Sequence, residues 1–437
     1  MTHSPAKPLS ELSDTELMAE LARRRTKTDG DVTALEDAAE AVKLEVGILV
    51  VRDGIEARCI REDGAPTRCP KCGGKARVEQ KRTRTVRTRS GEQTYLRNCY
   101  RCSACRHGFA PVDNELGISP RGTLTPEVEK RILDFGVNDS FEEAARRFSM
   151  HYSWDISENL VRRVVDRVAD VLESLPEPVL QAALQKPSVK PAKLITIGID
   201  GSMLSTREGW QETKLGVVIR DEHHLEGTPT TRGLITQARY VAASKLSELK
   251  PRLLAAAQAA GVDTAEHVVV VGDGAAWIRL LAEELFVMAI VVLDWPHVVE
   301  HLMACGKALL GEGSDLLQTW KRTTTTLVWN GKLDLLLAEL AAVRDDSIEA
   351  VDALMGYLTN HRESMHYPRF RELGLPTGSG VAESAHKHVL QVRMKRAGQH
   401  WSPPRCNRMA RLRAAYRTGG PTFASRIDTA RLALIGF

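Results

Sequence analysis

The sequence has no uninterrupted apolar run of the roughly 20 residues that a membrane-spanning helix needs. Its first residues, MTHSPAKPLSELSDTEL, lack the apolar core of a secretion signal. A large excess of one charge is also missing, because 60 Lys and Arg are matched by 56 Asp and Glu, which leaves a net charge of +4. We therefore expect a cytoplasmic protein with no membrane partner, and the net charge alone says little about what it binds.

Cysteine is present at eight positions, and in a reducing compartment such residues are more often metal ligands or free thiols than disulfides. Four of them form two pairs, Cys69-Pro-Lys-Cys72 and Cys102-Ser-Ala-Cys105. Four thiolates at this spacing can close a tetrahedral, structural zinc site, and the alternative is four free buried cysteines. Cys99 is a possible substitute ligand, whereas the remaining three cysteines lack paired spacing.

Basic residues are concentrated between the two cysteine pairs. Eleven Lys or Arg lie between Cys69 and His107, against only Glu79 and Glu92. The run KRTRTVRTRSGEQTYLRN alternates with a period of two, which predicts a hairpin that turns near Ser90 and Gly91. We interpret this hairpin as a surface for nucleic-acid phosphates rather than a merely solvated face. The expected phosphate contacts are Lys81, Arg82, Arg84, Arg87 and Arg89.

The chain of 437 residues is long enough for two to four domains, and its patterning predicts a multidomain α/β protein. Ser10 or Ser13 is expected to cap a first helix, with a break at Gly30 and Asp31, in a helical arm suited to self-association. Residues 175–193 contain four prolines and are interpreted as a linker. The predicted regions are an N-terminal helical region (1–58), a zinc-ribbon module (59–115), a helix-turn-helix (116–178), the first part of an α/β core (190–296), a helical insertion (297–375) and the C-terminal helical part of the core (376–437).

Three acidic residues lie beside small residues at the predicted ends of elements. Asp200 follows the strand LITIGI, Asp273 follows HVVVVG, and Glu383 lies in GSGVAES at the start of a helix. An apolar strand that ends in a carboxylate is costly unless the charge is solvated, paired or bound to a cation. Converging carboxylates of this kind can hold two Mg²⁺ or Mn²⁺ ions for chemistry on phosphodiesters, although each acid alone would be interpreted as a cap or turn residue.

A further pair, Asp294 and His297, lies at the next strand-to-helix junction. We expect either supporting roles at the carboxylate site or a helix-capping Asp with a packed His. His297-Val-Val-Glu300-His301 also matches the H-x-x-E-H pattern of inverted zinc peptidases, but this pattern is short and leaves Asp200 and Asp273 unexplained.

Five stretches resemble bacterial insertion-sequence transposases of the Kra type. They are CPKCGG, IGIDGSMLSTREGWQETKLG, VVVVGDGAAWI, VVLDWPHVVEHL and LTNHRESMHYPRFRELGLPTGSGVAESAHKHVLQVRMKRAG. The resemblance implies that Asp200, Asp273 and Glu383 are a DDE triad in an RNase H-like core, with 297–375 as an insertion. It also implies that Asp294 and His297 correspond to the Asp/Cys-x-x-His motif of Mutator-like transposases.

By this resemblance the protein is a DDE transposase that cleaves DNA and transfers strands, and is associated with the nucleoid. Its expected partners are double-stranded DNA, as terminal inverted repeats and target, and at least one further copy of itself. Arg162, Arg163 and Arg167 of the third predicted helix are expected in a major groove, and Arg393, Lys395 and Arg396 near the phosphates at the site. The alternative is a DNA-binding regulator derived from a transposase, which a strand-transfer assay would separate.

Overall fold

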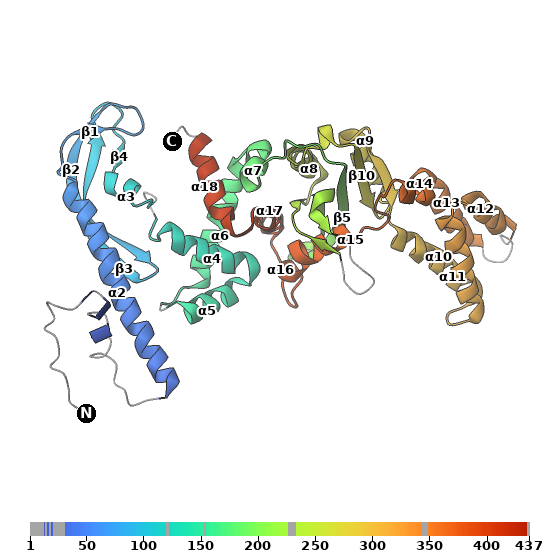
Figure 1. Ribbon diagram of the computed structural model, residues 1–437, viewed down its shortest axis with the longest axis horizontal. Coiled ribbons are helices and arrows are strands. Elements are labelled where there is room, and N and C mark those ends of the chain that lie inside the picture. Colours follow the sequence, from blue (N-terminus) through green and yellow to red (C-terminus); the bar gives the residue numbers. More distant parts are fainter. Residues whose placement is uncertain are drawn as a thin grey trace. The chain divides into compact units, whose positions relative to one another are not determined.

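The computed structural model describes residues 13, 15–16, 19–20, 31–118, 122–152, 154–225, 233–342 and 348–434. It divides into two compact units, Met1–Val164 and Val165–Phe437 (Figure 1). The first unit therefore contains both the zinc-ribbon region and most of the three-helix region, which the sequence suggested as separate domains. No helix of the described residues is both long and apolar enough to cross a membrane.

The first unit is built on a small antiparallel sheet in the order β1-β2-β3-β4. Its strands are β1 (Thr67–Arg68), β2 (Lys75–Thr88), β3 (Gly91–Cys102) and β4 (Gly108–Phe109). The pairing of β2 with β3 runs from Ala76↔Cys102 to Thr88↔Gly91, which confirms the basic hairpin and its turn. Gly91 takes a φ of 100°, a left-handed conformation that favours glycine.

A long helix, α2 (Val32–Arg61), covers one face of this hairpin. Asp31, one of the two residues at which the sequence predicted a break, is its N-cap and accepts a hydrogen bond from the Ala34 amide. The helix runs past residue 58, where the sequence suggested a domain boundary, and residues on both sides of that position, Ile55 and Cys59, pack on the hairpin core. Upstream, Ser13 and Glu16 cap each other reciprocally, whereas Ser10 lies outside the described residues.

Three helices follow a short helix α3 (Pro111–Glu115), as the sequence predicted. They are α4 (Pro126–Asn138), α5 (Phe141–His151) and α6 (Glu158–Ser174). Thr125 and Pro126 begin α4, and the Ser140 hydroxyl accepts a hydrogen bond from the Glu143 amide at the start of α5.

The second unit contains a mixed five-stranded sheet in the order β11-β10-β5-β6-β9. Strands β5, β6 and β9 form an antiparallel meander, whereas β10 and β11 run parallel to β5. The strands are β5 (Leu194–Thr206), β6 (Gly209–Arg220), β9 (Arg239–Ala243), β10 (His267–Gly272) and β11 (Ile290–Leu293), and β7 (His224–Leu225) pairs with β8 (Leu234–Ile235) apart from this sheet.

Helices cover both faces of the sheet. On one face, α8 (Leu246–Ala260) and α9 (Ala276–Leu285) pack against β5 and β10 through residues such as Ile197 and Val270. On the other face, Val269, Val271 and Leu293 contact the helical insertion. Alternate residues of β10 therefore face opposite cores, as the two-residue period of a strand requires.

The insertion is helical, as expected from the sequence. Its helices are α10 (Trp295–Leu310), α11 (Asp315–Trp329), α12 (Leu333–Ala342), α13 (Ile348–Asn360) and α14 (Tyr367–Glu372). Both ends of the insertion are hydrogen-bonded to each other, because the Trp295 amide donates to the Thr377 carbonyl over 2.9 Å.

One expectation about local structure is wrong. The proline-rich stretch 175–193 is not only a linker, since it contains α7 (Glu177–Leu184), whose Leu180 and Leu184 are buried. Prolines in the first turn of a helix are compatible with it, which is why they did not break this one.

The C-terminal part of the chain is helical, as the sequence predicted, but it is divided into several segments. It consists of α15 (Gly380–Ala385), a π-helical turn (His386–Gln391), α16 (Val392–Met394) and, after a break, α17 (Pro403–Gly419), which α18 (Phe423–Leu434) follows.

Candidate functional site

The strand register places three aspartates at the same level of the sheet. Val271 pairs with Gly198, so the same register continued by two residues sets Asp273 beside Asp200. Gly272 pairs with Leu293, so one further residue sets Asp273 beside Asp294. Neighbouring strands lie about 4.8 Å apart, and residues in register on parallel strands face the same side. The structure therefore brings together Asp200 and Asp273, as the sequence suggested, although Asp200 lies within β5 rather than at its end.

The helix that carries Glu383 packs against the same part of β5. A Cβ atom on Gly198 would lie 3.2 Å from Cβ of Ala382, so α15 approaches the strand closely at this glycine. Gly198 and Asp200 are two residues apart and thus face the same side of the sheet, toward α15. Glu383 itself is exposed on this helix.

Asp294 is buried, and its carboxylate accepts hydrogen bonds from two backbone amides. One of its oxygens accepts from the Ser379 amide and the other from the His297 amide at 3.4 Å, so that it caps α10 and also holds the loop before α15. Its side chain is 3% exposed. Of the two roles considered for Asp294, the structure shows the helix cap.

Asp200 lies in an unfavourable environment for a free carboxylate. Burial raises the pKa of Asp200 above its usual range, and the negative charge of Asp273 raises it further. The electrostatic effect of His386 and a 2.6 Å hydrogen bond from the Gly201 amide lower the pKa of Asp200 in opposition. The two aspartates therefore repel each other, a situation that a divalent cation would relieve.

His386 was not identified from the sequence. Its ring is 3% exposed, and its Nε2 atom lies 3.4 Å from Oδ2 of Asp200. Burial lowers the pKa of His386, and the Asp200 carboxylate opposes this shift. The only signal in the sequence is its position three residues after Glu383, about one helical turn, which is too weak a pattern to single out a residue.

The H-x-x-E-H residues do not form a metal site. Nδ1 of His297 lies 3.0 Å from a Glu300 oxygen, and the His301 ring stacks on Tyr357 with a centroid distance of 3.7 Å. The pattern is on α10 as expected, but its Glu and first His are paired with each other and its second His is engaged by a tyrosine. This arrangement gives no support to a peptidase.

The four paired cysteines form a group that could bind zinc. Their sulfur atoms all lie within 4.8 Å of one another, and the Cys69–Cys105 and Cys72–Cys102 pairs are each 3.6 Å apart. Zinc–sulfur bonds of 2.3 Å in a tetrahedron imply sulfur separations of about 3.8 Å, which this cluster matches. Hydrogen bonds from the Cys105 and Ala104 amides lower the pKa of Cys102 to about 6, which favours the thiolate that zinc requires.

Glycine permits this cluster to close. A Cβ atom on Gly74 would lie 3.3 Å from Sγ of Cys72 and 3.4 Å from Sγ of Cys102. Within the described part of the chain this is the one group of three or more His, Cys, Asp or Glu ligands gathered so tightly. Asp200, Asp273 and Glu383 are not drawn together to that degree.

Two of the basic residues expected to contact DNA are buried. Arg84 is 8% exposed and pairs with the buried Asp113, which also binds Arg97 over 2.7 Å and the Tyr95 hydroxyl over 2.8 Å. Arg393 is 1% exposed and lies over the Trp401 ring. The expectation of direct phosphate contacts is therefore wrong for these two, because their guanidinium groups are enclosed by the protein.

The other candidates remain predictions, and the structure shows only where they lie. Arg87 pairs with Glu92 and stacks on Trp154, and the side chains of Arg162 and Arg163 both bond Asn159 on α6. Exposed candidates are Lys81, Arg82, Arg89, Arg163 and Lys395, and partly exposed ones are Arg87, Arg162, Arg167 and Arg396.

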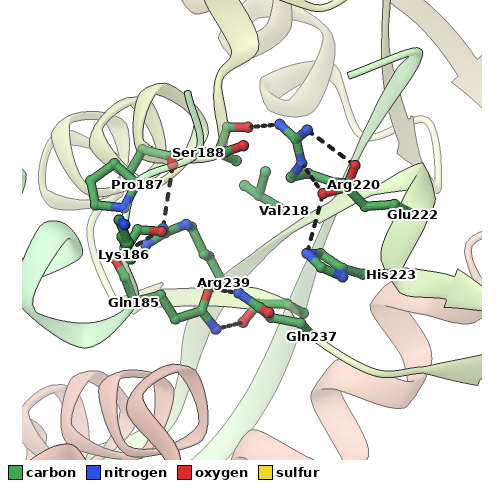
Figure 2. Close-up of a pocket in the computed structure, with 13 residues that line it drawn as sticks. Gln185, Lys186, Pro187, Ser188, Val218, Arg220, Glu222, His223, Gln237 and Arg239 are labelled. Carbon is green, nitrogen blue, oxygen red and sulfur yellow. Dashed lines mark hydrogen bonds and ion pairs between the residues drawn. The ribbon is translucent and has the colours of Figure 1, made fainter. Parts of the chain in front are cut away.

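A cavity of about 160 Å³ lies at the other end of the sheet (Figure 2). Arg220 on its wall pairs with Ile195, five residues before Asp200 along β5. Arg220 donates to the Ala260 and Lys190 carbonyls and Arg239 to the Gln181 and Gln185 carbonyls, so these guanidinium groups fasten the segment after α7 to the sheet. The cavity is separate from the aspartates, and its arginines are occupied by the backbone.

Comparison with known proteins identifies a family. A family model described as "Uncharacterised protein family (UPF0236)" matches residues 71–430. The "UPF0236 protein in vanSb 3'region" of Streptococcus gallolyticus is 33% identical over 129 residues, which is 29% of this chain and only 27% of that protein. The solved structure "Drosophila P element transposase strand transfer complex" aligns with a TM-score of 0.33 and 12% identity over 70% of this chain and 95% of that one, a likeness too distant to carry an argument. The Kra-type relation remains a prediction, whereas the family match over most of the sequence shows that the chain belongs to the uncharacterised protein family UPF0236.

Proposed function

We propose that this chain is a DDE transposase, which cuts DNA at the ends of an insertion sequence and joins those ends to target DNA. The observation that carries the proposal is the placement of Asp200 beside Asp273 on parallel strands, with the helix of Glu383 packed against β5 at Gly198. The sheet, with three antiparallel and two parallel strands, is compatible with the RNase H-like core that the sequence suggests.

The site fits a divalent cation in its chemistry. Two adjacent carboxylates that repel each other provide the oxygen ligands that Mg²⁺ or Mn²⁺ prefers, and Glu383 would complete the set from α15. Two such ions, when bound, supply positive charge that favours attack on a phosphodiester and stabilises the departing oxygen. Asp200 and Asp273 would hold them from the sheet, while Asp294 fixes the loop before α15.

Two reactions are proposed. In the first, water attacks a phosphodiester at the element end, the P–O3′ bond breaks, and a 3′-hydroxyl and a 5′-phosphate remain. In the second, that 3′-hydroxyl forms a new P–O bond in target DNA as a P–O3′ bond there breaks. The zinc module and helices α4–α6 would bind the terminal inverted repeats through exposed basic side chains such as Lys81 and Arg82. Joining two ends in one reaction implies at least a dimer on DNA.

The test is cleavage of a labelled linear DNA that carries the element end, with and without Mg²⁺, by the full chain. We expect Mg²⁺-dependent cleavage that Asp200→Asn and Asp273→Asn abolish while DNA binding is retained. Asp263→Asn, at an exposed aspartate beyond α8, is the matched control and should cleave normally. Cleavage by Asp200→Asn would rule out the assignment, and specific DNA binding without cleavage by the unaltered protein would instead favour a regulator.

A further inference from the structure

We propose that His386 is a positioning residue that holds the Asp200 carboxylate in the orientation needed to bind a cation. This inference rests on the proposed function, because it concerns how the same site is organised. It assigns a role to a residue that lies outside the predicted triad and supporting pair.

The imidazole of His386 is enclosed by the protein, whereas the Asp200 side chain is partly exposed. His386 has 3% of its side chain exposed, and its Nε2 atom lies 3.4 Å from Oδ2 of Asp200. Nε2 is buried and makes no hydrogen bond in the described part of the chain, and both the carboxylate and the backbone of Asp200 act on the imidazole. Leaving a buried imidazole nitrogen without a partner is costly, which favours a close approach between these two groups.

The two oxygens of Asp200 are held from different directions. Oδ1 accepts the 2.6 Å hydrogen bond from the Gly201 amide, and Oδ2 faces His386. A carboxylate oxygen has two lone pairs, so each can keep one contact to the protein and still offer a lone pair to a cation. Fixing both oxygens prevents the carboxylate from rotating, and outer groups of this kind orient metal ligands in many proteins.

The backbone at His386 has an unusual conformation, which hydrogen bonds from a buried arginine stabilise. His386 begins a π-helical turn that continues to Gln391, a rare conformation that occurs often at functional sites. Such a turn displaces carbonyl groups from their usual helical partners. Arg413 of α17, which is 0% exposed, donates to the His388 carbonyl over 2.7 Å and to the Val389 carbonyl, and so holds the turn in place.

His386 also connects two parts of the site. It lies about one helical turn after Glu383, and α15 continues into the π-helical turn without a break. The contact with Asp200 therefore fixes the rotation of the helix that carries Glu383 relative to β5. Removal of the imidazole should increase the mobility of the Asp200 carboxylate directly. It should also increase the mobility of Glu383, to a smaller extent, through the helix.

The test measures Mn²⁺ binding to the full chain by electron paramagnetic resonance of the free ion, which does not depend on catalysis. We expect His386→Leu, which is similar in bulk but has no polar atom, to weaken Mn²⁺ binding by roughly 10-fold or more. His386→Gln, whose amide can still donate to Asp200, should recover most of the affinity. His388→Leu, at an exposed histidine two residues along the same turn, should bind Mn²⁺ as the unaltered protein does.

Asp200→Asn separates this inference from the proposed function. If the unaltered protein binds Mn²⁺ and Asp200→Asn does not, the cation site stands, and unchanged binding by His386→Leu then overturns the positioning role alone. Equal losses in His386→Leu and His386→Gln, with an unchanged unfolding midpoint, would also overturn it. If the unaltered protein binds no Mn²⁺, both the proposed function and this inference fail.

Discussion

Arg84 and Lys81 are three residues apart on the same basic strand, yet the structure gives them different roles. Arg84 is enclosed beside Asp113, whereas Lys81 is exposed on the hairpin. The sequence held a signal for this difference, since Arg84 lies two residues before the buried Val86 and therefore faces the same side. A count of basic residues does not reveal this difference, because it ignores the alternation of buried and exposed positions along a strand.

We expect Arg84→Ala to destabilise the first unit and Lys81→Ala to weaken DNA binding. Arg84→Ala should cost roughly 1–3 kcal/mol of unfolding free energy, because the buried Asp113 keeps Arg97 and Tyr95 but loses one of its two charged partners. Lys81→Ala should change stability by less than about 0.5 kcal/mol but lower the salt dependence of DNA binding by about one phosphate contact. Urea unfolding and DNA titrations at several salt concentrations measure both; a reversed pattern would mean that Arg84 reaches DNA.

Asp200 should make the protein less stable at neutral pH in the absence of divalent cations. Its pKa is raised by burial, so the folded state holds the proton more tightly than the unfolded state does, and stability falls as the pH rises through this window. Asp200→Asn should therefore raise the unfolding midpoint at pH 7, with a gain that shrinks as the pH falls from the raised pKa of Asp200 toward the ordinary value of about 4 and is absent below it. Thermal unfolding in a chelator across this range checks it, and a gain that grows in acid would contradict the pKa shift.

Elements were predicted better than the contacts between them. The apolar runs LITIGI and HVVVVG predicted β5 and β10, because the apolar character of a buried strand is visible in the local sequence. The π-helical turn and the burial of His386 could not be predicted, since both depend on Arg413 and Asp200, which are distant along the chain. Asp200 and Asp273 were found because each follows an apolar run of residues. Their position side by side depends on the pairing register between strands, which no single strand sequence determines.

Gly198 is a position on β5 at which α15 packs closely against the strand. An added Cβ would lie 3.0 Å from Val217 and 3.2 Å from Ala382, so both the neighbouring strand and α15 would have to shift. We expect Gly198→Ala to cost roughly 1–3 kcal/mol of unfolding free energy and to reduce DNA cleavage more than DNA binding. Gly356→Ala is the control, because this α13 glycine has nothing within 4 Å of an added Cβ and the change should stabilise the helix by up to about 1 kcal/mol. Full cleavage by Gly198→Ala would show that the position of α15 is not critical.

At the scale of the whole molecule, each unit has cores of its own. The first unit has apolar clusters around the hairpin and around the paired cysteines, and the second has one on each face of its sheet. The sequence predicted several domains but set the boundaries by changes in composition, whereas packing decides which regions share a core. This is why α2 belongs with the hairpin and α7 with the sheet.

We expect two unfolding transitions in calorimetry, of which zinc chelation lowers only one. Zinc binding contributes directly to the folding of small modules, so Cys105→Ser should affect the first unit as chelation does. Cys305→Ser, at a buried thiol in the insertion core, should instead lower the other transition. A single transition that moves with all three treatments would contradict independent units.

The hydrogen bonds of Asp294 and Thr377 have a consequence for how this architecture can vary. They clamp together the points where the chain leaves the sheet for α10 and comes back before α15. Residues added or removed at the far tips of the intervening helices need not shift the register of the returning segment, whose entry point is fixed. The helical excursion is therefore free to change in length among relatives, while the geometry around Asp200 is preserved.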